Sequence, residues 1–91
     1  MITTEKDSEG RIIAYCEYQI VNKEGLQDEY GEYTFINDIW LHHTYRPKIF
    51  RRLMHKMVNN ELTKYPLVKW IYFKRDKHGG RMKMYEIRRM L

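Results

Sequence analysis

Cysteine is nearly absent from this chain, since Cys16 is the only one among 91 residues. A single cysteine can form no intrachain disulfide, which predicts a protein of a reducing compartment, the cytoplasm. No stretch approaches the roughly 20 consecutive apolar residues that span a bilayer. The N-terminus also lacks an apolar signal core. The sequence therefore predicts a cytoplasmic protein that does not cross a membrane.

Glycine and proline are scarce, with five and two residues. No glycine stands near Thr44–Pro47, where a predicted strand passes into a predicted helix, so the glycines of a phosphate-binding loop are missing there. The sequence also shows no internal repeat, low-complexity segment or domain boundary. We therefore expect a single small domain that covers residues 1–91.

Basic and aromatic residues are abundant instead. The chain has 17 Lys and Arg against 12 Asp and Glu, a formal charge of +5, and 14% aromatic residues. Most acidic residues lie in the first half, whereas most Lys and Arg lie from Arg46 onward. A basic half predicts an anionic partner, which leaves nucleic acid, a phosphate-bearing coenzyme and an acidic protein open.

Period-two hydrophobic patterns predict the strands. Residues 2–4 form a short candidate edge strand, and 11–21 is the clearest strand. Residues 33–42 form a further strand whose two faces both carry large apolar groups. One face comprises Tyr33, Phe35, Asn37, Ile39 and Leu41. Residues 67–73 are almost all apolar, as in a strand covered on both sides.

Two helices complete the predicted fold. Apolar residues at helical spacing predict a helix from Pro47 to about Lys64, with Thr44 as its cap. A second, short helix is predicted for residues 81–91. A strand, a helix and a strand in this order predict a βαβ unit with parallel strands. The expected fold is therefore α+β: a small mixed sheet of antiparallel strands followed by a βαβ unit, with two helices.

The joint between residues 36–43 and the helix that follows is the first candidate site. A strand that turns directly into a helix aims free backbone N–H groups and the positive end of the helix dipole at one point. Such a point binds anions, and phosphate is the usual occupant in coenzyme binders.

Three segments resemble motifs of the GNAT (Gcn5-related) N-acetyltransferases. Residues 10–15, GRIIAY, resemble the family's second-strand pattern G-[KR]-I-[IV]-G-[YF]. Residues 36–46, INDIWLHHTYR, resemble the fourth-strand pattern I-x-x-[LI]-x-V-x-P-x-[YF]-R. Tyr85-Glu86-Ile87 resembles part of the late segment [FY]-Y-E-[KR]-[LH]-G-F. Their order and spacing cover roughly residues 10–91 and imply a GNAT-like fold.

The resemblance implies a site for acetyl-coenzyme A, which in this family lies where two neighbouring strands splay apart. Trp40, Leu41 and His42 would line its pantetheine arm. The residues implied at the helix N-terminus, around the pyrophosphate, are Arg46, Lys48, Phe50, Arg51 and Arg52. Tyr85 would return a proton to the departing thiolate. Asp38 is the nearest candidate for the base that deprotonates an amine acceptor, with Glu32, His42 and His43 as further candidates.

A non-catalytic binding module is the alternative. Ile49 and Arg51 occupy the two glycine positions of the family motif R-x-x-G-x-[GA], and their side chains would close the coenzyme cleft. The basic C-terminal half would then contact nucleic acid or a protein. The plainer explanations are a solvated basic helix face for the arginines, a packing role for Tyr85 and a hydrogen-bonded or outward-facing Asp38.

Two further expectations concern metals and assembly. His42 and His43 are neighbours on a strand and point to opposite faces, so no zinc site is expected there. Cys16 stands among apolar alternates and is interpreted as a small core residue. A sheet with exposed edges favours a homodimer.

Overall fold

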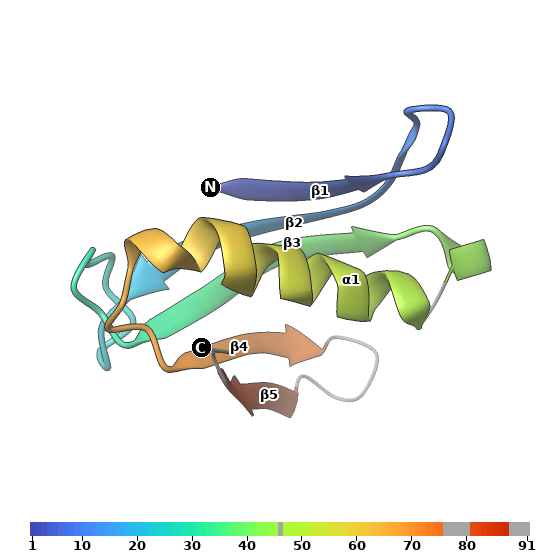
Figure 1. The fold of residues 1–91 in the computed structure, drawn as a ribbon. Helices are drawn as coiled ribbons and strands as arrows, with labels where there is room; N and C mark the ends of the chain where they lie inside the picture. The colour runs from blue at the N-terminus through green and yellow to red at the C-terminus, as the bar shows by residue number, and fades with distance from the viewer. Residues whose placement is uncertain (46, 76–80, 88–91) are drawn as a thin grey trace.

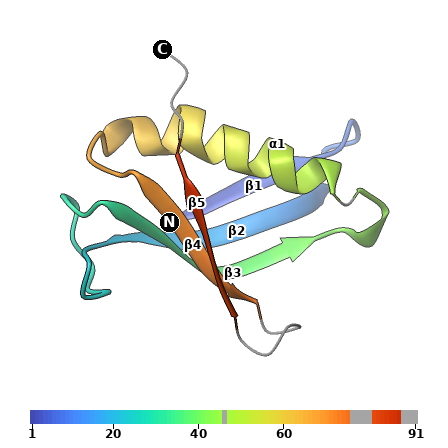
Figure 2. The same cartoon turned by 90° about the horizontal axis from the view of Figure 1, so that it is seen from below.

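The computed structural model describes residues 1–45, 47–75 and 81–87, which form a sheet of five strands with a helical segment across one face (Figures 1 and 2). The strands are β1 (Ile2–Lys6), β2 (Ile12–Val21), β3 (Tyr33–Leu41), β4 (Trp70–Arg75) and β5 (Arg81–Glu86). They lie in chain order across the sheet. Neighbours pair antiparallel except β3 and β4, which pair in parallel. The predicted α+β class with a small mixed sheet is confirmed.

The helical segment connects β3 to β4. It begins with a 3-10 turn, η1 (His43–Tyr45), and continues as α1 (Lys48–Lys56), a π-helical segment η2 (Met57–Glu61) and a 3-10 turn η3 (Leu62–Lys64). Helical backbone thus extends to Lys64, as the sequence predicts. Pro47 is the N-cap of α1 and makes no side-chain capping bond. The predicted cap Thr44 lies inside η1 instead.

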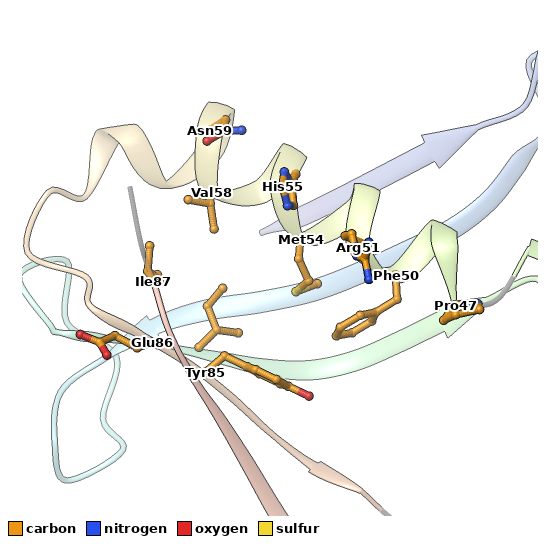
Figure 3. Close-up of a pocket in the computed structure, with 11 residues that line it drawn as sticks. Pro47, Phe50, Arg51, Met54, His55, Val58, Asn59, Tyr85, Glu86 and Ile87 are labelled. Atoms are coloured by element: carbon orange, nitrogen blue, oxygen red, sulfur yellow. The ribbon is translucent and has the colours of Figure 1, made fainter. Parts of the chain in front are cut away.

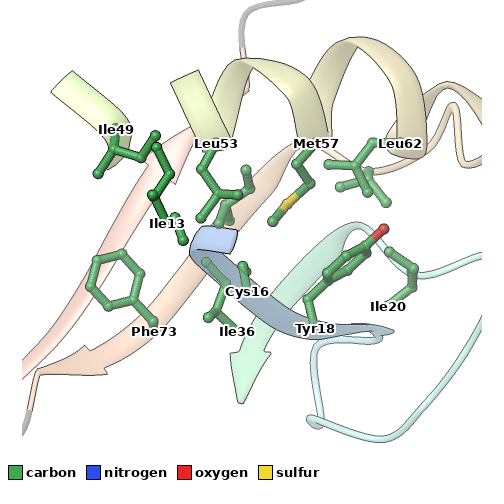
Figure 4. Close-up of a cluster of buried hydrophobic side chains, with 13 residues drawn as sticks. Ile13, Cys16, Tyr18, Ile20, Ile36, Ile49, Leu53, Met57, Leu62 and Phe73 are labelled. Atoms are coloured by element: carbon green, nitrogen blue, oxygen red, sulfur yellow. The ribbon is translucent and has the colours of Figure 1, made fainter. Parts of the chain in front are cut away.

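The core lies between this helical segment and the sheet (Figure 4). Ile49, Leu53 and Met57 recur every four residues and expose 1% or less of their surface. They pack on the alternate positions of β2, from Ala14 to Ile20. Burying one such side chain contributes about 1.5–3 kcal/mol. The four-residue spacing in α1 and the two-residue spacing in β2 therefore place apolar side chains on facing surfaces, which holds the helix on this face of the sheet.

Cys16 lies at the centre of that interface. Its side chain is fully buried, and burial raises the pKa of its thiol to about 12. The structure confirms the interpretation of Cys16 as a small core residue, because a buried neutral thiol is a poor nucleophile.

A β-bulge in β3 changes which side chains face the helix. Glu17 of β2 pairs with Asp38, but the next residue, Tyr18, pairs with Ile36, so Asn37 has no opposite residue. The extra residue reverses the alternation at this point. Ile36 is buried in the core and Ile39 packs against it. The prediction that Asn37 and Ile39 share a face with Tyr33 is therefore wrong for Ile39, because strict period two fails at a bulge.

The predicted helix over residues 81–91 is also wrong where the structure describes it. Residues 81–86 form β5, which pairs antiparallel with β4 from Arg75–Arg81 to Trp70–Glu86. The segment has apolar residues at both helical and alternate spacing. Pairing with β4 satisfies its backbone groups and overrides the local helical pattern. The remainder of this predicted helix, residues 88–91, lies outside the described residues.

In the described part of the chain, no helix is long and apolar enough to cross a membrane.

Candidate functional site

An elongated pocket of about 430 Å³ lies between α1 and the β4–β5 hairpin (Figure 3). Its volume falls in the range of small-molecule sites. The helix forms one wall and the end of β5 forms the other. The lining residues are Pro47, Phe50, Arg51, Met54, His55, Val58, Asn59, Ile71, Tyr85, Glu86 and Ile87.

The helix wall consists of two rows of side chains at i, i+4 spacing. Phe50, Met54 and Val58 form an apolar row that points toward β5 (Figure 3). A polar row of Arg51, His55 and Asn59 runs beside it. From Pro47 to Asn59 the helix rises roughly 18 Å at 1.5 Å per residue. The pocket is therefore long and apolar, with a polar rim.

Tyr85 closes the pocket from the sheet side. It pairs with Ile71 of β4, whose side chain is buried beneath α1, so Tyr85 faces the helix as well. Its ring stacks on Phe73 at a centroid distance of 5.9 Å and lies 6.5 Å from Phe50. The side chain is 43% exposed. Packing thus holds the ring on one side, and the residue as a whole remains partly exposed.

The structure brings three of the residues nominated from the sequence into this pocket: Phe50, Arg51 and Tyr85. Sequence reasoning missed His55 and Asn59, although their i, i+4 spacing from Arg51 is a signal that could have found them. It also missed the apolar wall around Met54, which was expected in the core. Ile71 and Ile87 could not be found, because only the β4–β5 pairing brings them to the helix.

The other basic residues nominated for phosphate lie elsewhere. Arg52 points away from the pocket and forms an ion pair with Glu5 of β1 at 3.2 Å. Lys56, which was not nominated, also contacts β1: it donates a hydrogen bond to the Thr4 carbonyl and lies 3.7 Å from the Glu5 carboxylate. Lys48 is exposed in the first turn of α1. Arg46 lies outside the described residues.

Ile49, at the first glycine position of the family motif, is only 1% exposed and belongs to the core. Its side chain packs toward the sheet and does not block the start of α1. Of the two residues that replace motif glycines, only Arg51 therefore stands at the pocket.

The strand residues nominated for the pantetheine arm do not line the pocket. Trp40 is 41% exposed and stacks on Tyr15 at 6.2 Å. Leu41 packs against the core. The His42 ring is edge-on to Trp40 at 6.1 Å and stacks on His43 at 4.7 Å. The expectation that His42 and His43 point to opposite faces of a strand is therefore wrong, because β3 ends at Leu41 and His43 begins η1. These side chains form a separate group at the end of β3.

Asp38, the nominated base, lies on the face of the sheet opposite α1. The Tyr15 hydroxyl donates a hydrogen bond of 2.8 Å to its carboxylate. This bond, with the charge of Asp38, raises the pKa of Tyr15 above its ordinary value. Asp38 is exposed and pairs with Glu17 across the strands. The sheet therefore separates Asp38 from Tyr85. The further base candidates also lie outside the pocket, since Glu32 pairs with Lys69 and neither His42 nor His43 lines it.

β3 and β4 pair over a short length only. Three residue pairs join them, from Tyr33–Trp70 to Phe35–Tyr72. Beyond these pairs the two strands diverge (Figure 2). Ile36–Leu41 of β3 then has pairing only with β2 among the described residues.

No cluster of three His, Cys, Asp or Glu side chains suited to a metal ion occurs within residues 1–45, 47–75 and 81–87. Comparison with models of known protein families and with curated protein sequences gives no match.

Proposed function

We propose that this protein is a small GNAT-like acyltransferase that binds acetyl-coenzyme A in the pocket between α1 and β5 and transfers the acetyl group to an amine. One observation carries the proposal. Phe50, Arg51 and Tyr85 are among the residues for which the motif resemblance implies a coenzyme-binding or catalytic role. They lie up to 35 positions apart in the chain, yet they line one pocket.

The shape and polarity of the pocket support this ligand. Its long apolar wall suits a slender acyl-pantetheine arm. Its end at Pro47 adjoins the start of α1, where the N-cap makes no side-chain hydrogen bond. Uncapped N–H groups and the helix dipole favour a negatively charged group at that end. Arg51 adds a guanidinium, which binds phosphate in a bidentate manner. Lys48, in the first turn of α1, adds a positive charge near that end.

The chain's own residues would supply the proton transfers. Acetyl-coenzyme A would bring the acetyl group as a thioester, and an amine would displace the thiol directly. Tyr85 carries a hydroxyl that can protonate the departing sulfur. His55 lies on the pocket rim, where an imidazole nitrogen can act as the general base that takes the proton lost by the amine. Asp38 would act only on an acceptor that approached from the other face of the sheet.

Calorimetric titration of acetyl-coenzyme A into Arg51→Gln and Arg52→Gln variants tests the site. The two substitutions remove the same charge from adjacent residues on different sides of α1. We expect saturable binding to the unchanged protein and to Arg52→Gln. We expect Arg51→Gln to weaken it by about tenfold or more, because a charge-assisted contact contributes about 1.5–3 kcal/mol.

Two results would refute the proposal. The first is the absence of binding up to millimolar coenzyme, which would refute the proposed acyltransferase activity. An equal loss of affinity in both variants would show that the coenzyme senses the general positive charge of the helix rather than this pocket.

A non-catalytic binding module is the second candidate, and the separation of Asp38 from Tyr85 by the sheet favours it. In such a module the pocket and the basic residues would bind a partner without chemistry. Saturable binding of acetyl-coenzyme A, with no acetylation of a panel of amines, would support this candidate. Titration with nucleic acid over a series of salt concentrations would test the alternative partner, because phosphate contacts weaken steeply with salt.

A further inference from the structure

The face of the sheet opposite α1 is rich in aromatic side chains. No helix or strand covers this face in the described part of the chain (Figure 2). The alternation of β2, β3 and β4 places on it Tyr15, Tyr33, Phe35, Trp40, Trp70 and Tyr72. We call these six residues the aromatic face. Met82 and Met84 of β5 pair with Lys74 and Tyr72 and extend it to the edge of the sheet.

Two groups of rings make contacts across strands on the aromatic face. Tyr15 of β2 stacks on Trp40 of β3. Tyr72 of β4 contacts both Phe35, at 5.0 Å, and Tyr33, at 6.0 Å. Trp40 is 41% exposed, and Met84 beside the rings is 53% exposed, whereas the other five rings are half-buried. Apolar side chains that gather on an uncovered face are typical of an interaction site.

The charges on this face are unfavourable for nucleic acid. The carboxylates of Glu17 and Asp38 lie beside Tyr15 and Trp40, where they would repel a phosphate backbone. Lys74, two positions beyond Tyr72 on β4, carries a positive charge on the same face. A surface with an aromatic centre and both signs of charge suits a protein partner.

The arrangement of those charges is self-complementary. β2 and β4 flank β3 on opposite sides. Glu17 lies level with Asp38 of β3. Lys74 lies two residues beyond the last β3–β4 pair, Phe35–Tyr72, on the opposite side of β3 from Glu17. A two-fold axis along β3 would set β2 of one copy against β4 of the other, which brings Glu17 toward Lys74 twice.

We propose that the aromatic face is the interface of a symmetric homodimer, in which two sheets pack face to face and the two α1 helices lie on the outside. The proposal rests on the open face alone and is independent of the pocket. Two-sheet packing of this type would bury the rings and leave the pockets of both copies accessible.

Sedimentation and tryptophan fluorescence over low to high micromolar concentration test the dimer. The two tryptophans, Trp40 and Trp70, both lie on the aromatic face, so dimerisation should shift their emission to shorter wavelength as concentration rises. We expect a mass of twice 11.3 kDa at high concentration. Trp40→Glu should raise the dissociation constant at least about 30-fold, as for an aromatic hot spot.

Two variants complete the design. Met84→Glu places a charge at the border of the same face and should also weaken the dimer. It provides a second test if Trp40→Glu does not fold, which circular dichroism would show. Leu26→Glu is the matched control, because Leu26 is 65% exposed in the connection between β2 and β3. It should leave the dimer unchanged.

Three outcomes would overturn the proposal. The first is a monomer at every concentration. The second is a dimer that survives both Trp40→Glu and Met84→Glu, which would place the contact at the edge strands. The third is strong, salt-sensitive quenching of tryptophan by a single-stranded oligonucleotide, which would make nucleic acid the occupant of this face.

Discussion

The two faces of this sheet carry different kinds of apolar residue and differ in what covers them. On one face, aliphatic side chains of β2 and α1 interlock, and Leu53 and Met57 are fully buried. On the other face, Trp40 stacks on Tyr15 and Tyr72 contacts Phe35, and no helix or strand in the described part of the chain lies over them. Aliphatic groups at matched helix and strand periods make an intramolecular core. Large rings with polar edges form a surface that remains partly accessible to solvent.

The aromatic pairs on the two faces show the same contrast. Phe50, Phe73 and Tyr85 meet beneath the helix and shape the pocket. Tyr15 and Trp40 stack in the open. Rings held between two layers can form a binding cavity, whereas rings on a single layer form a docking surface. This difference leads us to propose a small-molecule ligand for one face and a second copy of the chain for the other.

The largest difference between the two faces should be in how much their side chains contribute to the free energy of unfolding. Leu53→Ala removes fully buried atoms from the core and should lower the free energy of unfolding by about 2–5 kcal/mol. Met84→Ala removes a half-exposed side chain and should cost less than about 1 kcal/mol. Denaturant unfolding at low protein concentration measures both values. A comparable loss in the two variants would show that the aromatic face contributes to the fold as much as the helix face does.

If the proposed acyltransferase activity is correct, substitutions on the two faces should also differ in their effect on kcat. Tyr85→Phe removes the hydroxyl in the pocket and should lower kcat by about 100-fold, the scale of general acid catalysis. Asp38→Asn should change kcat by less than about twofold, because Asp38 lies on the other face. Steady-state assays with an amine acceptor measure both rates. The reverse order of effects would move the reaction to the aromatic face.

The smallest expected difference between the two faces is in the pKa values of their tyrosines. A hydrogen bond to Asp38 raises the pKa of Tyr15 on the aromatic face, whereas burial raises the pKa of Tyr18 to about 12 on the helix face. Asp38→Ala should return the pKa of Tyr15 toward its ordinary value and leave that of Tyr18 near 12. An NMR titration of the ring signals measures both values. If the pKa values of both tyrosines fell in Asp38→Ala, the two shifts would not have separate causes.

The pKa of Tyr18 also fixes a direction for alkaline stability. The unfolded chain loses the phenol proton near the ordinary value of 10, and the folded chain loses it only near 12. The stability that Tyr18 contributes is therefore complete below pH 10 and is lost as the pH rises from 10 to about 12. Unfolding measured across this range in Tyr18→Phe should show a shallower alkaline decline.

The sequence by itself determined the helix-face core. The i, i+4 stripe through Leu53 and the alternation around Cys16 are local patterns, and each needs only its own residues to be recognised. They predicted β2, the helical segment to Lys64 and the burial of Cys16. The motif resemblance also nominated Tyr85 and Arg51, two residues that the structure places in one pocket.

Only the tertiary structure decided the remainder. Residues 81–86 form a strand because β4 offers a partner for their backbone, and no local pattern contains that information. The bulge at Asn37 exists only relative to β2, yet it turns Trp40 and Asp38 to the open face. The pocket requires both α1 and β5, and the aromatic face requires three strands in register. Pairing between distant segments sets these features, and a linear pattern cannot specify the partner with which a strand will pair.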